Sequence, residues 1–245
     1  MGETRKTVLF IVEGPSDKTA LEKIFKKIYR YERGIEFRFT DGDVSSDPET
    51  TITTVENKIY SIVDAFIKDK KLKKSDIFQV IQIFDMDGAY IPDTAISYGN
   101  SGAFAYSLTG ISCNDPQKVK DRNMQKRKIM DHLLSLHEIK GLAYEMYYMS
   151  CNLDHALYNE MNLSKDKKQS YADAFYERFL GNEDKFIGFL QTDVVNGVPN
   201  SFIASWRYIK EDLHSVERCI CLLQADRLSF LQQSRPLEIH LRVQR

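Results

Sequence analysis

Hydrophobic and polar positions follow two alternating patterns over the first two thirds of the chain. Short runs rich in Val, Ile, Leu and Phe have the length of strands that are buried on both faces of a parallel sheet. These runs predict strands at 6–12 and 77–84, alternating apolar and polar residues predict another at 35–40, and a fourth is predicted at 144–149. Apolar side chains at helical spacing predict helices over 17–31, after Pro48, over 117–137 and from 153 to 160. The alternation predicts an α/β fold with a mainly parallel sheet of about four strands flanked by helices.

The last third of the chain has a different pattern. Residues 170–190 and 202–224 have helical periodicity, and the segment 193–200, with its Asn-Gly pair and a proline, predicts a turn between them. We therefore expect an α/β domain over 1–160 and an α-helical addition over 161–245, which ends in a tail of about ten residues. The stretch 88–115 lacks a clear period, and it predicts a long ordered loop with a strand near 104–108.

Acidic residues follow two of the apolar runs directly. Glu13 and Asp17 follow the first predicted strand, and Asp85 and Asp87 follow the third. Because open α/β sheets place their chemistry at the carboxyl ends of the strands, we expect these carboxylates to converge. Carboxylates that converge repel each other unless a cation lies between them. Hard oxygen ligands suit Mg²⁺ or Mn²⁺, so the pattern predicts a metal-dependent enzyme that acts on phosphate esters.

Each acid also has a purely structural interpretation. A strand-end glutamate can cap the next helix, but Ser16 and Asp17 are available for capping, which favours Glu13 as a metal ligand or general base. Asp85 and Asp87 would point to the same side of an extended chain and reach one cation, although turn acids often have this spacing. Asp17 has a sufficient structural role at a helix start. A second pair, in Asp41-Gly42-Asp43, is typical of a turn, although the end of its strand is close enough for it to contribute an extra ligand.

Basic residues gather in one segment around the predicted helix at 117–137. They are Lys118, Lys120, Arg122, Lys126, Arg127 and Lys128. A groove for a phosphate backbone needs such a cluster, but a solvated helix face has the same composition. A later segment mixes aromatic residues with cations, and there Arg207 or Lys210 is a candidate for stabilising charge on a reacting phosphate. We expect Trp206, in the same segment, to lie in the core.

Composition narrows the class of protein only modestly. The 245 residues are 42% hydrophobic and 28% charged, with a net charge of −1. This charge argues against a binder that holds nucleic acid by bulk charge, but it is compatible with a local basic groove. The four cysteines form no metal-binding pattern, so we expect free buried thiols in a reducing cytoplasm, with Cys219 and Cys221 in a helix. No apolar run approaches the ~20 residues that span a bilayer, and no signal peptide is recognisable, which predicts a cytoplasmic protein without a membrane partner.

The acidic motifs resemble those of the Toprim domain, which occurs in topoisomerases, bacterial primases, recombination mediators and nucleases of the OLD and RloB-like kinds. The strand followed by Glu13 and the Asp-x-Asp at Asp85 and Asp87 look like its two signature motifs. Asp17 is similar to the second acid of the Glu-x-x-x-Glu/Asp arrangement in the nuclease branch. The segment 148–155 looks like the Ser-Asn-x-x-x-Glu strand end of that branch, with Asp154 where glutamate is usual. The resemblance covers roughly residues 6–157.

The resemblance implies a Mg²⁺- or Mn²⁺-dependent nuclease that cleaves DNA or RNA with one or two metal ions. It implies metal ligands at Glu13, Asp17, Asp85, Asp87 and Asp154. It also implies that Glu13, Asp85 and Asp87 act in catalysis together with a late lysine, for which Lys210 is a candidate. Because the chain has no GxxxxGK[ST] sequence, the resemblance suggests a separate ATPase partner in a bacterial anti-phage or abortive-infection system. A non-catalytic nucleic-acid-binding or regulatory module is the alternative, and a homo-oligomer is compatible with either.

Overall fold

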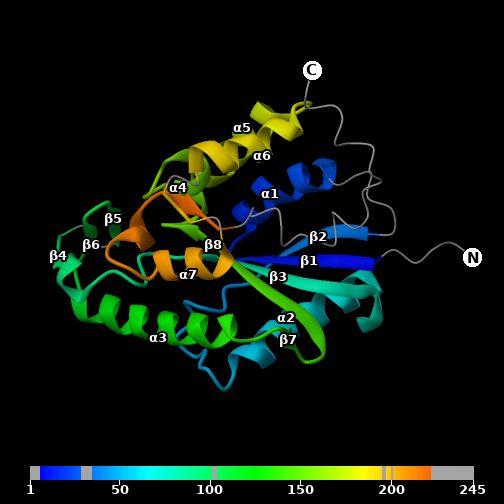
Figure 1. Ribbon diagram of the computed structural model, residues 1–245, viewed down its shortest axis with the longest axis horizontal. Coiled ribbons are helices and arrows are strands. Elements are labelled where there is room, and N and C mark those ends of the chain that lie inside the picture. Colours follow the sequence, from blue (N-terminus) through cyan, green and yellow to red (C-terminus); the bar gives the residue numbers. More distant parts are fainter. Residues whose placement is uncertain (1–5, 29–34, 101–103, 195–196, 200, 222–245) are drawn as a thin grey trace, which may run out of the picture.

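Figure 1 shows the computed structural model, in which a twisted sheet has helices on both faces. The structure describes residues 6–28, 35–100, 104–194, 197–199 and 201–221. Several predicted features lie wholly or partly outside the described residues: the end of the first helix at 29–31, part of the turn at 193–200, the end of the last helix at 222–224, and the tail at 234–245.

The main sheet contains four parallel strands and two short antiparallel ones. Its strands are β1 (Lys6–Val12), β2 (Ile35–Asp41), β3 (Ile77–Asp85), β7 (Glu138–Ile139), β8 (Leu142–Ser150) and β9 (Cys219–Ile220). The order is β2-β1-β3-β8-β7, and β9 pairs with the end of β8. The strands β2, β1, β3 and β8 are parallel, so the prediction of a mainly parallel sheet of about four strands is confirmed. The carboxyl ends of β1, β3 and β8 therefore lie side by side.

Helices cover both faces of this sheet. They are α1 (Pro15–Ile28), α2 (Val55–Lys70), α3 (Pro116–Leu134), α4 (Leu153–Tyr158), α5 (Lys168–Phe179), α6 (Glu183–Phe189) and α7 (Phe202–Tyr208). Four short helical segments lie between these elements along the chain: η1 (Lys74–Asp76), η2 (Asp93–Ala95), η3 (Leu190–Val194) and η4 (His214–Val216). In Figure 1, α1, α5 and α6 lie above the strands, and α2 and α3 lie below them. The helices α5 and α6 both pack against α1, so the chain beyond residue 160 contacts the first helix directly.

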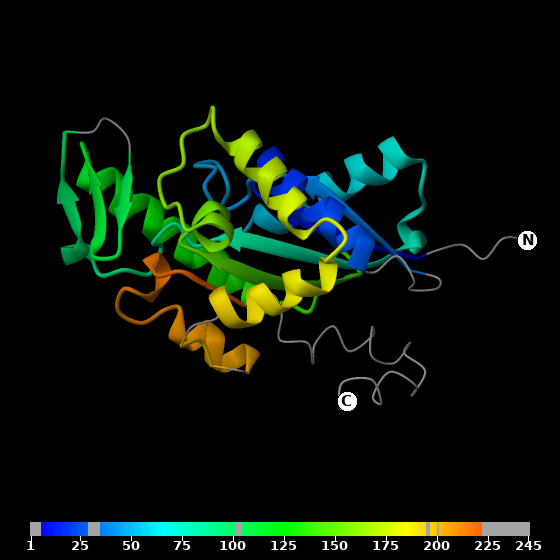
Figure 2. The same cartoon turned by 90° about the horizontal axis from the view of Figure 1, so that it is seen from above.

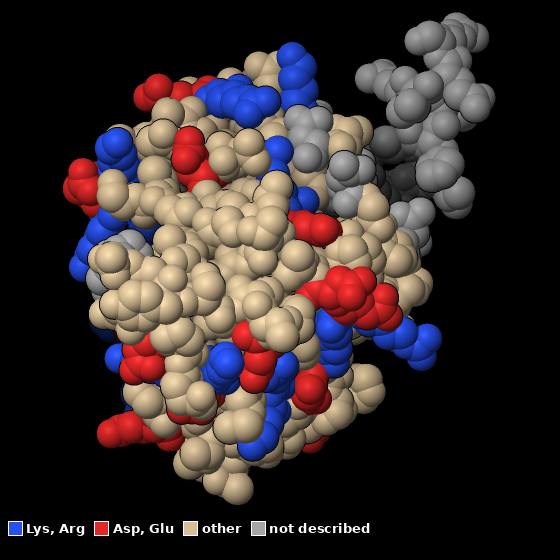
Figure 3. All heavy atoms as spheres, turned by 90° about the vertical axis from the view of Figure 1, so that its left-hand side faces the viewer, with Lys and Arg blue, Asp and Glu red and all other residues tan. Residues whose placement is uncertain are grey.

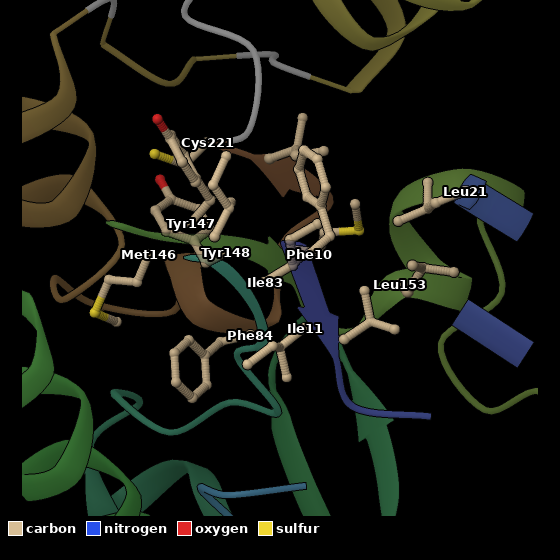
Figure 4. Packing of buried hydrophobic residues seen from close by; sticks show 14 of the residues in the cluster. Phe10, Ile11, Leu21, Ile83, Phe84, Met146, Tyr147, Tyr148, Leu153 and Cys221 are labelled. Atoms are coloured by element: carbon tan, nitrogen blue, oxygen red, sulfur yellow. The ribbon is translucent and has the colours of Figure 1, made fainter. Parts of the chain in front are cut away.

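Aromatic side chains form much of the core between the sheet and its helices. Phe10 of β1 stacks on Phe39 of β2, with 4.6 Å between ring centroids, and meets Phe25 of α1 edge-on at 5.3 Å. On β8, the ring of Tyr148 packs edge-on against Trp206 at 5.0 Å, and Trp206 is only 2% exposed. The prediction that Trp206 lies in the core is confirmed. Figure 4 shows Phe10 and Tyr148 among the buried side chains where β1, β3 and β8 meet.

The stretch 88–115 forms a second sheet where a long loop was expected. Its strands are β4 (Ile96–Tyr98), β5 (Ala105–Ser107) and β6 (Gly110–Cys113), in the order β4-β6-β5. Only the strand expected near 104–108 is confirmed, as β5. The strands are too short to show a period, and Gly110 permits their close packing, because a Cβ there would lie 1.9 Å from the carbonyl oxygen of Ala95. Figure 2 shows this small sheet at the end of the molecule opposite the N-terminus.

The helix expected over 202–224 is wrong beyond its first two turns. The helix α7 ends at Tyr208, and the chain returns to the main sheet as β9, in which Cys219 is paired with Ser150. The backbone N–H of Cys221 then donates to the carbonyl of Tyr148 at 3.1 Å. A short apolar run suits a buried helix or a buried strand equally, and pairing with β8 decides between them. All four cysteines are buried thiols outside any disulfide, as predicted.

Candidate active site

The first acids of the two motifs meet at the carboxyl edge of the main sheet. Glu13 directly follows β1, and Asp85 is the last residue of the neighbouring strand β3. Glu13 Oε1 accepts a hydrogen bond from the backbone N–H of Asp85 at 3.3 Å and another from the hydroxyl of Ser45 at 3.0 Å. Parallel pairing of β1 with β3 thus brings two residues 72 positions apart into direct contact.

The backbone turns away from the direction of β3 at Asp87, the second acid of the Asp-x-Asp motif. Asp87 has a φ of 50°, so the expectation of an extended chain through both acids is wrong at this residue. The turn is fixed from two directions, because the N–H of Asp87 donates to Cys151 O at 2.6 Å and its carbonyl accepts from Arg122 Nη2 at 2.7 Å. Gly88 follows with a φ of 65°, where a Cβ would lie 2.9 Å from a Val216 methyl group. The two acids of the motif therefore have different environments.

Lys126 of α3 lies inside the acid cluster. Its ammonium group donates to Asp87 Oδ2 at 2.7 Å and lies 3.4 Å from Glu13 Oε1, and its side chain is 0% exposed. The sequence-based hypothesis placed Lys126 in an open groove that binds a phosphate backbone, and its complete burial does not suit that role. In the structure Lys126 is the counter-ion that joins the acids of the two motifs.

Arg122 and Tyr106 complete the surroundings of Asp87. The Tyr106 hydroxyl donates to Asp87 Oδ1 at 3.3 Å and accepts from Arg122 Nη1 at 3.1 Å. The guanidinium of Arg122 also lies over the Phe104 ring, 5.0 Å from its centroid. Because Tyr106 belongs to β5, the small sheet contributes directly to this site. Sequence reasoning did not identify Tyr106, and an aromatic residue in an aperiodic stretch gives no signal that would single it out.

Burial and neighbouring charges separate the acids by their pKa values. Burial raises the pKa of Glu13 from 4.5 to about 7, and Lys126 opposes this rise only in part. Burial, followed by the charges of Glu13 and Asp17, raises the pKa of Asp85. Burial also acts to raise the pKa of Asp87, but Lys126 and Arg122 outweigh it and the pKa is lowered. Among the described residues no lysine or arginine forms an ion pair with Asp85, and its carboxylate is therefore the acid most in need of a cation.

A second group of charges lies on the other side of Asp85. Asp17 Oδ2 accepts from the N–H of Gly14 at 2.8 Å, which closes the turn before α1, and burial is the main cause that raises the pKa of Asp17 to about 6. Asp154, in the first turn of α4, is 3% exposed, and its Oδ2 pairs with Lys168 at 2.7 Å. Its other oxygen, Oδ1, is buried and has no hydrogen-bond partner among the described residues. This group therefore also contains an oxygen that can accept a further ligand.

Asp85 connects the two groups of charges. Its Oδ1 accepts the backbone N–H of Leu153, the first residue of α4, at 2.9 Å. Burial lowers the pKa of Lys168, but its hydrogen bond with Asp154 and the charges of Asp154, Asp17 and Asp85 more than reverse this effect. Asp85 therefore interacts both with the group that contains Lys126 and with the group that contains Lys168.

The late lysine predicted from sequence lies elsewhere. Lys210 Nζ donates to Asp131 Oδ1 at 2.6 Å and lies over the Tyr90 ring. Arg207 and Lys210 both line a separate cavity of about 360 Å³ between α3 and α7. From the part of the chain beyond residue 160, Lys168 at the start of α5 pairs with an acid of the site, in addition to Lys126 of α3. Lys168 lies in a polar stretch with several lysines, and only the packing of α5 on α1 distinguishes it.

The predicted basic segment does not form one basic surface. All six cations lie on α3, but Arg122 and Lys126 point into the site, whereas Lys118 and Lys128 are exposed. Lys120 and Arg127 are partly exposed. Figure 3 shows the face at the small-sheet end of the molecule, where basic and acidic side chains alternate around a broad uncharged area. A solvated helix face accounts for the exposed part of this segment.

The donor set is chemically suited to a hard divalent cation. Five carboxylates lie in or beside the site: Glu13, Asp17, Asp85, Asp87 and Asp154. Within the described part of the chain, no three His, Cys, Asp or Glu side chains form a ready metal-binding group. Two of these acids are already paired with lysines, Asp87 with Lys126 and Asp154 with Lys168. The raised pKa of Asp85 and the unpartnered oxygen of Asp154 both indicate a local shortage of positive charge.

Two further searches, for membrane-spanning helices in the part of the chain that the structure describes and for similar proteins, find nothing. Among the described residues, no helix has both the length and the apolar character needed to cross a membrane. Comparisons with family models, with curated proteins and with solved structures find no match for this chain.

Proposed function

We propose that this chain is a metal-dependent nuclease with a Toprim-like catalytic domain, which hydrolyses phosphodiester bonds in DNA or RNA. The observation that carries this proposal is the direct contact between Glu13 and Asp85 at the carboxyl ends of adjacent parallel strands. Perturbed carboxylates that converge at this edge of an α/β sheet are typical of a catalytic site. The spacing of the acidic motifs, which resembles that of Toprim nucleases, supports the same reaction class.

The residues of the site can be assigned to the steps of hydrolysis. Mg²⁺ or Mn²⁺, held by Asp85 with Glu13 and with Asp17 or Asp154, would supply Lewis-acid activation of water and of the phosphate. Glu13, with its pKa of about 7, is suited to take a proton from the attacking water near neutral pH. The water oxygen bonds to phosphorus, the bond from phosphorus to the leaving sugar oxygen breaks, and that oxygen takes up a proton. Lys168, which is partly exposed, would offset negative charge on the phosphate, as was expected of Lys210.

A cavity beside the acids supports a nucleic-acid substrate. It has a volume of about 670 Å³ and lies between α4 and α5, where Tyr158, Tyr171, Phe175 and Arg178 line it. Tyr158 follows Asp154 by one turn of α4, so this wall of the cavity continues from the site, and burial together with the charges of Asp154 and Asp17 raises the pKa of Tyr158. Aromatic rings with an arginine suit the stacking of bases from a single strand.

The biological setting of the proposal comes from the Toprim resemblance. Because the sequence contains no P-loop, we propose that a separate ATPase partner controls the nuclease. We further propose that the pair acts in the bacterial cytoplasm in defence against phage.

A non-catalytic Toprim-like binding or regulatory module is the second candidate. The observation that favours it is that Lys126 and Lys168 already neutralise Asp87 and Asp154. Such internal ion pairs would allow an acidic site to persist without metal or turnover. The two candidates differ in whether cleavage depends on metal and on Glu13.

The deciding experiment is a cleavage assay with matched glutamate variants. The purified chain, alone and with its ATPase partner, is incubated with plasmid, single strands and tRNA in Mg²⁺, Mn²⁺ or EDTA. We expect metal-dependent cleavage that Glu13→Gln slows on the order of 10²-fold or more, because acid–base and metal contributions are each of that size. Glu36→Gln is the control, since Glu36 lies beside the first residues of β1, at the opposite edge of the sheet, and pairs with Arg38. Cleavage that persists in Glu13→Gln would place the catalytic centre elsewhere, and no metal-dependent cleavage under any condition would favour the binding module.

A further inference from the structure

We infer that this site takes one divalent cation, because the ammonium group of Lys126 occupies the place that a second cation would need. The inference rests on the proposed function, and it specifies the number of metal ions. Two-metal sites hold their ions about 3.5–4 Å apart, so two ions here would have to lie close together among these acids. In this chain, Lys126 Nζ lies 2.7 Å from Asp87 and 3.4 Å from Glu13, and so it bridges one acid from each motif.

Lys126 is built into the fold and is not a surface side chain that happens to reach the acids. On α3 the buried positions are Val119, Asn123, Lys126, Ile129, Met130 and Leu133. This spacing of three and four residues is the stripe of a helix that faces the protein interior. The side chain of Lys126 is 0% exposed, so a hydrated metal ion cannot share its position. The geometry of α3 thus fixes a monovalent cation between Glu13 and Asp87.

Protein donors already engage both carboxylate oxygens of Asp87. Its Oδ2 accepts from Lys126, and its Oδ1 accepts from the Tyr106 hydroxyl. The guanidinium of Arg122 binds its carbonyl oxygen as well. Because Lys126 and Arg122 lower the pKa of Asp87, a metal ion at this acid would have to compete with the positive charge of both.

Asp85 and Asp154 identify the place of the single ion. Asp85 has no cation as an ion-pair partner among the described residues, and Oδ1 of Asp154 is buried without a hydrogen bond. The carboxylates around this place outnumber the cations: Asp43, whose charge acts on Glu13, adds to Glu13, Asp17, Asp85, Asp87 and Asp154, whereas the cations are Arg122, Lys126 and Lys168. This balance favours a divalent cation beside Asp85.

The test is a count of bound Mn²⁺. Equilibrium titration of the full chain with Mn²⁺, with the free ion measured by electron paramagnetic resonance, should give one ion per chain. In Lys126→Met the position between Glu13 and Asp87 opens, and the count should rise to two. Lys128→Met removes an exposed lysine from the same helix, and it should leave the count at one. Asp85→Asn should abolish binding of the single ion.

Each outcome separates this inference from the proposed function. Two ions in the parent, or one ion in a folded Lys126→Met variant, would overturn the role of Lys126 while leaving the nuclease proposal intact. No bound ion in the parent would overturn the inference together with the metal requirement, and the cleavage assay would then report independently on turnover. If Lys126→Met fails to fold, Lys126→Gln is measured in the same way, because glutamine keeps a hydrogen-bond donor for Asp87 and removes the charge. A parent that binds two ions overturns the inference, whichever variant folds.

Discussion

Removal of charge from the two acids of the Asp-x-Asp motif should change stability in opposite directions. Asp87→Asn removes the partner at 2.7 Å from Lys126 and leaves this fully buried ammonium with only Glu13 at 3.4 Å. Asp85→Asn removes a charge that has no paired cation among the described residues, and it keeps an oxygen that can accept the N–H of Leu153. The first change breaks an ion pair, whereas the second relieves repulsion.

The expected magnitudes follow from burial. Loss of one partner from a buried ion pair costs about 3–5 kcal/mol. A protein of this size changes its Tm by about 2–4 °C per kcal/mol, so Asp87→Asn should lower Tm by roughly 6–20 °C. Because the Asp87 side chain is 17% exposed, we expect a value in the lower half of that range. The raised pKa of Asp85 means that its ionised form disfavours folding, and each pKa unit that Asp85→Asn removes stabilises by about 1.4 kcal/mol.

Thermal unfolding followed by circular dichroism at pH 7.5 in EDTA measures both changes without interference from metal. Asp93→Asn is the control, because Asp93 is exposed just beyond the motif and its variant should melt like the parent. If Asp85→Asn and Asp87→Asn shift Tm in the same direction, the separation of the two acids by Lys126 is wrong.

Two further predictions concern the remaining charges. In EDTA, Tm of the parent should fall as the pH rises from about 5 to 7.5, because the folded state holds protons more tightly at Glu13, with a pKa of about 7, and at Asp17, with a pKa of about 6, and loses stability as they ionise. Glu13→Gln should make this fall less steep, and an unchanged slope would contradict the assignment. Lys168→Met should destabilise the protein by about 1–3 kcal/mol in urea unfolding, since it leaves the buried carboxylate of Asp154 unpaired. Lys167→Met, at the exposed neighbour, should have little effect, and equal losses in both variants would show that the ion pair is not the cause.

The main sheet was predictable because its central strands are buried on both faces. Such strands consist almost wholly of apolar residues, and β1 and β3 show this clearly in the sequence. The strand β9 was missed because its apolar run is equally compatible with a helix, and only pairing with β8 decides its conformation. The small sheet was missed because its strands β4, β5 and β6 are too short to establish alternation.

The acids of the site were predictable for a related reason. Glu13 and Asp85 end strands that are adjacent and parallel, so the topology that the sequence predicts already brings them together. The placement of Asp87 was not predictable, because its left-handed φ depends on contacts with Cys151 and Arg122 from distant parts of the chain. Lys168 likewise reaches the site only through the packing of α5 on α1.

Lys126 is different, because its position was visible in the sequence. It continues the buried stripe of α3 that Val119, Asn123 and Met130 define, at the spacing of an interior helix face. The other basic residues around Lys126 in the sequence obscure this periodicity. A lysine on an apolar stripe, in a chain whose strand ends are acidic, predicts an internal counter-ion better than it predicts a surface contact.

Some of these acids also stabilise the fold, so loss of activity in a variant does not by itself assign a residue to the chemistry. Asp87 holds Lys126, and Asp154 holds Lys168, so a variant of either can lose cleavage because the edge of the sheet is disturbed. Glu13 and Asp85 are better probes, because burial raises the pKa of each and removal of the charge should maintain or increase stability in the absence of metal. A variant that is as stable as the parent but no longer cleaves would assign its residue to the chemistry. Glu13→Gln and Asp85→Asn are therefore the substitutions on which the proposed reaction depends.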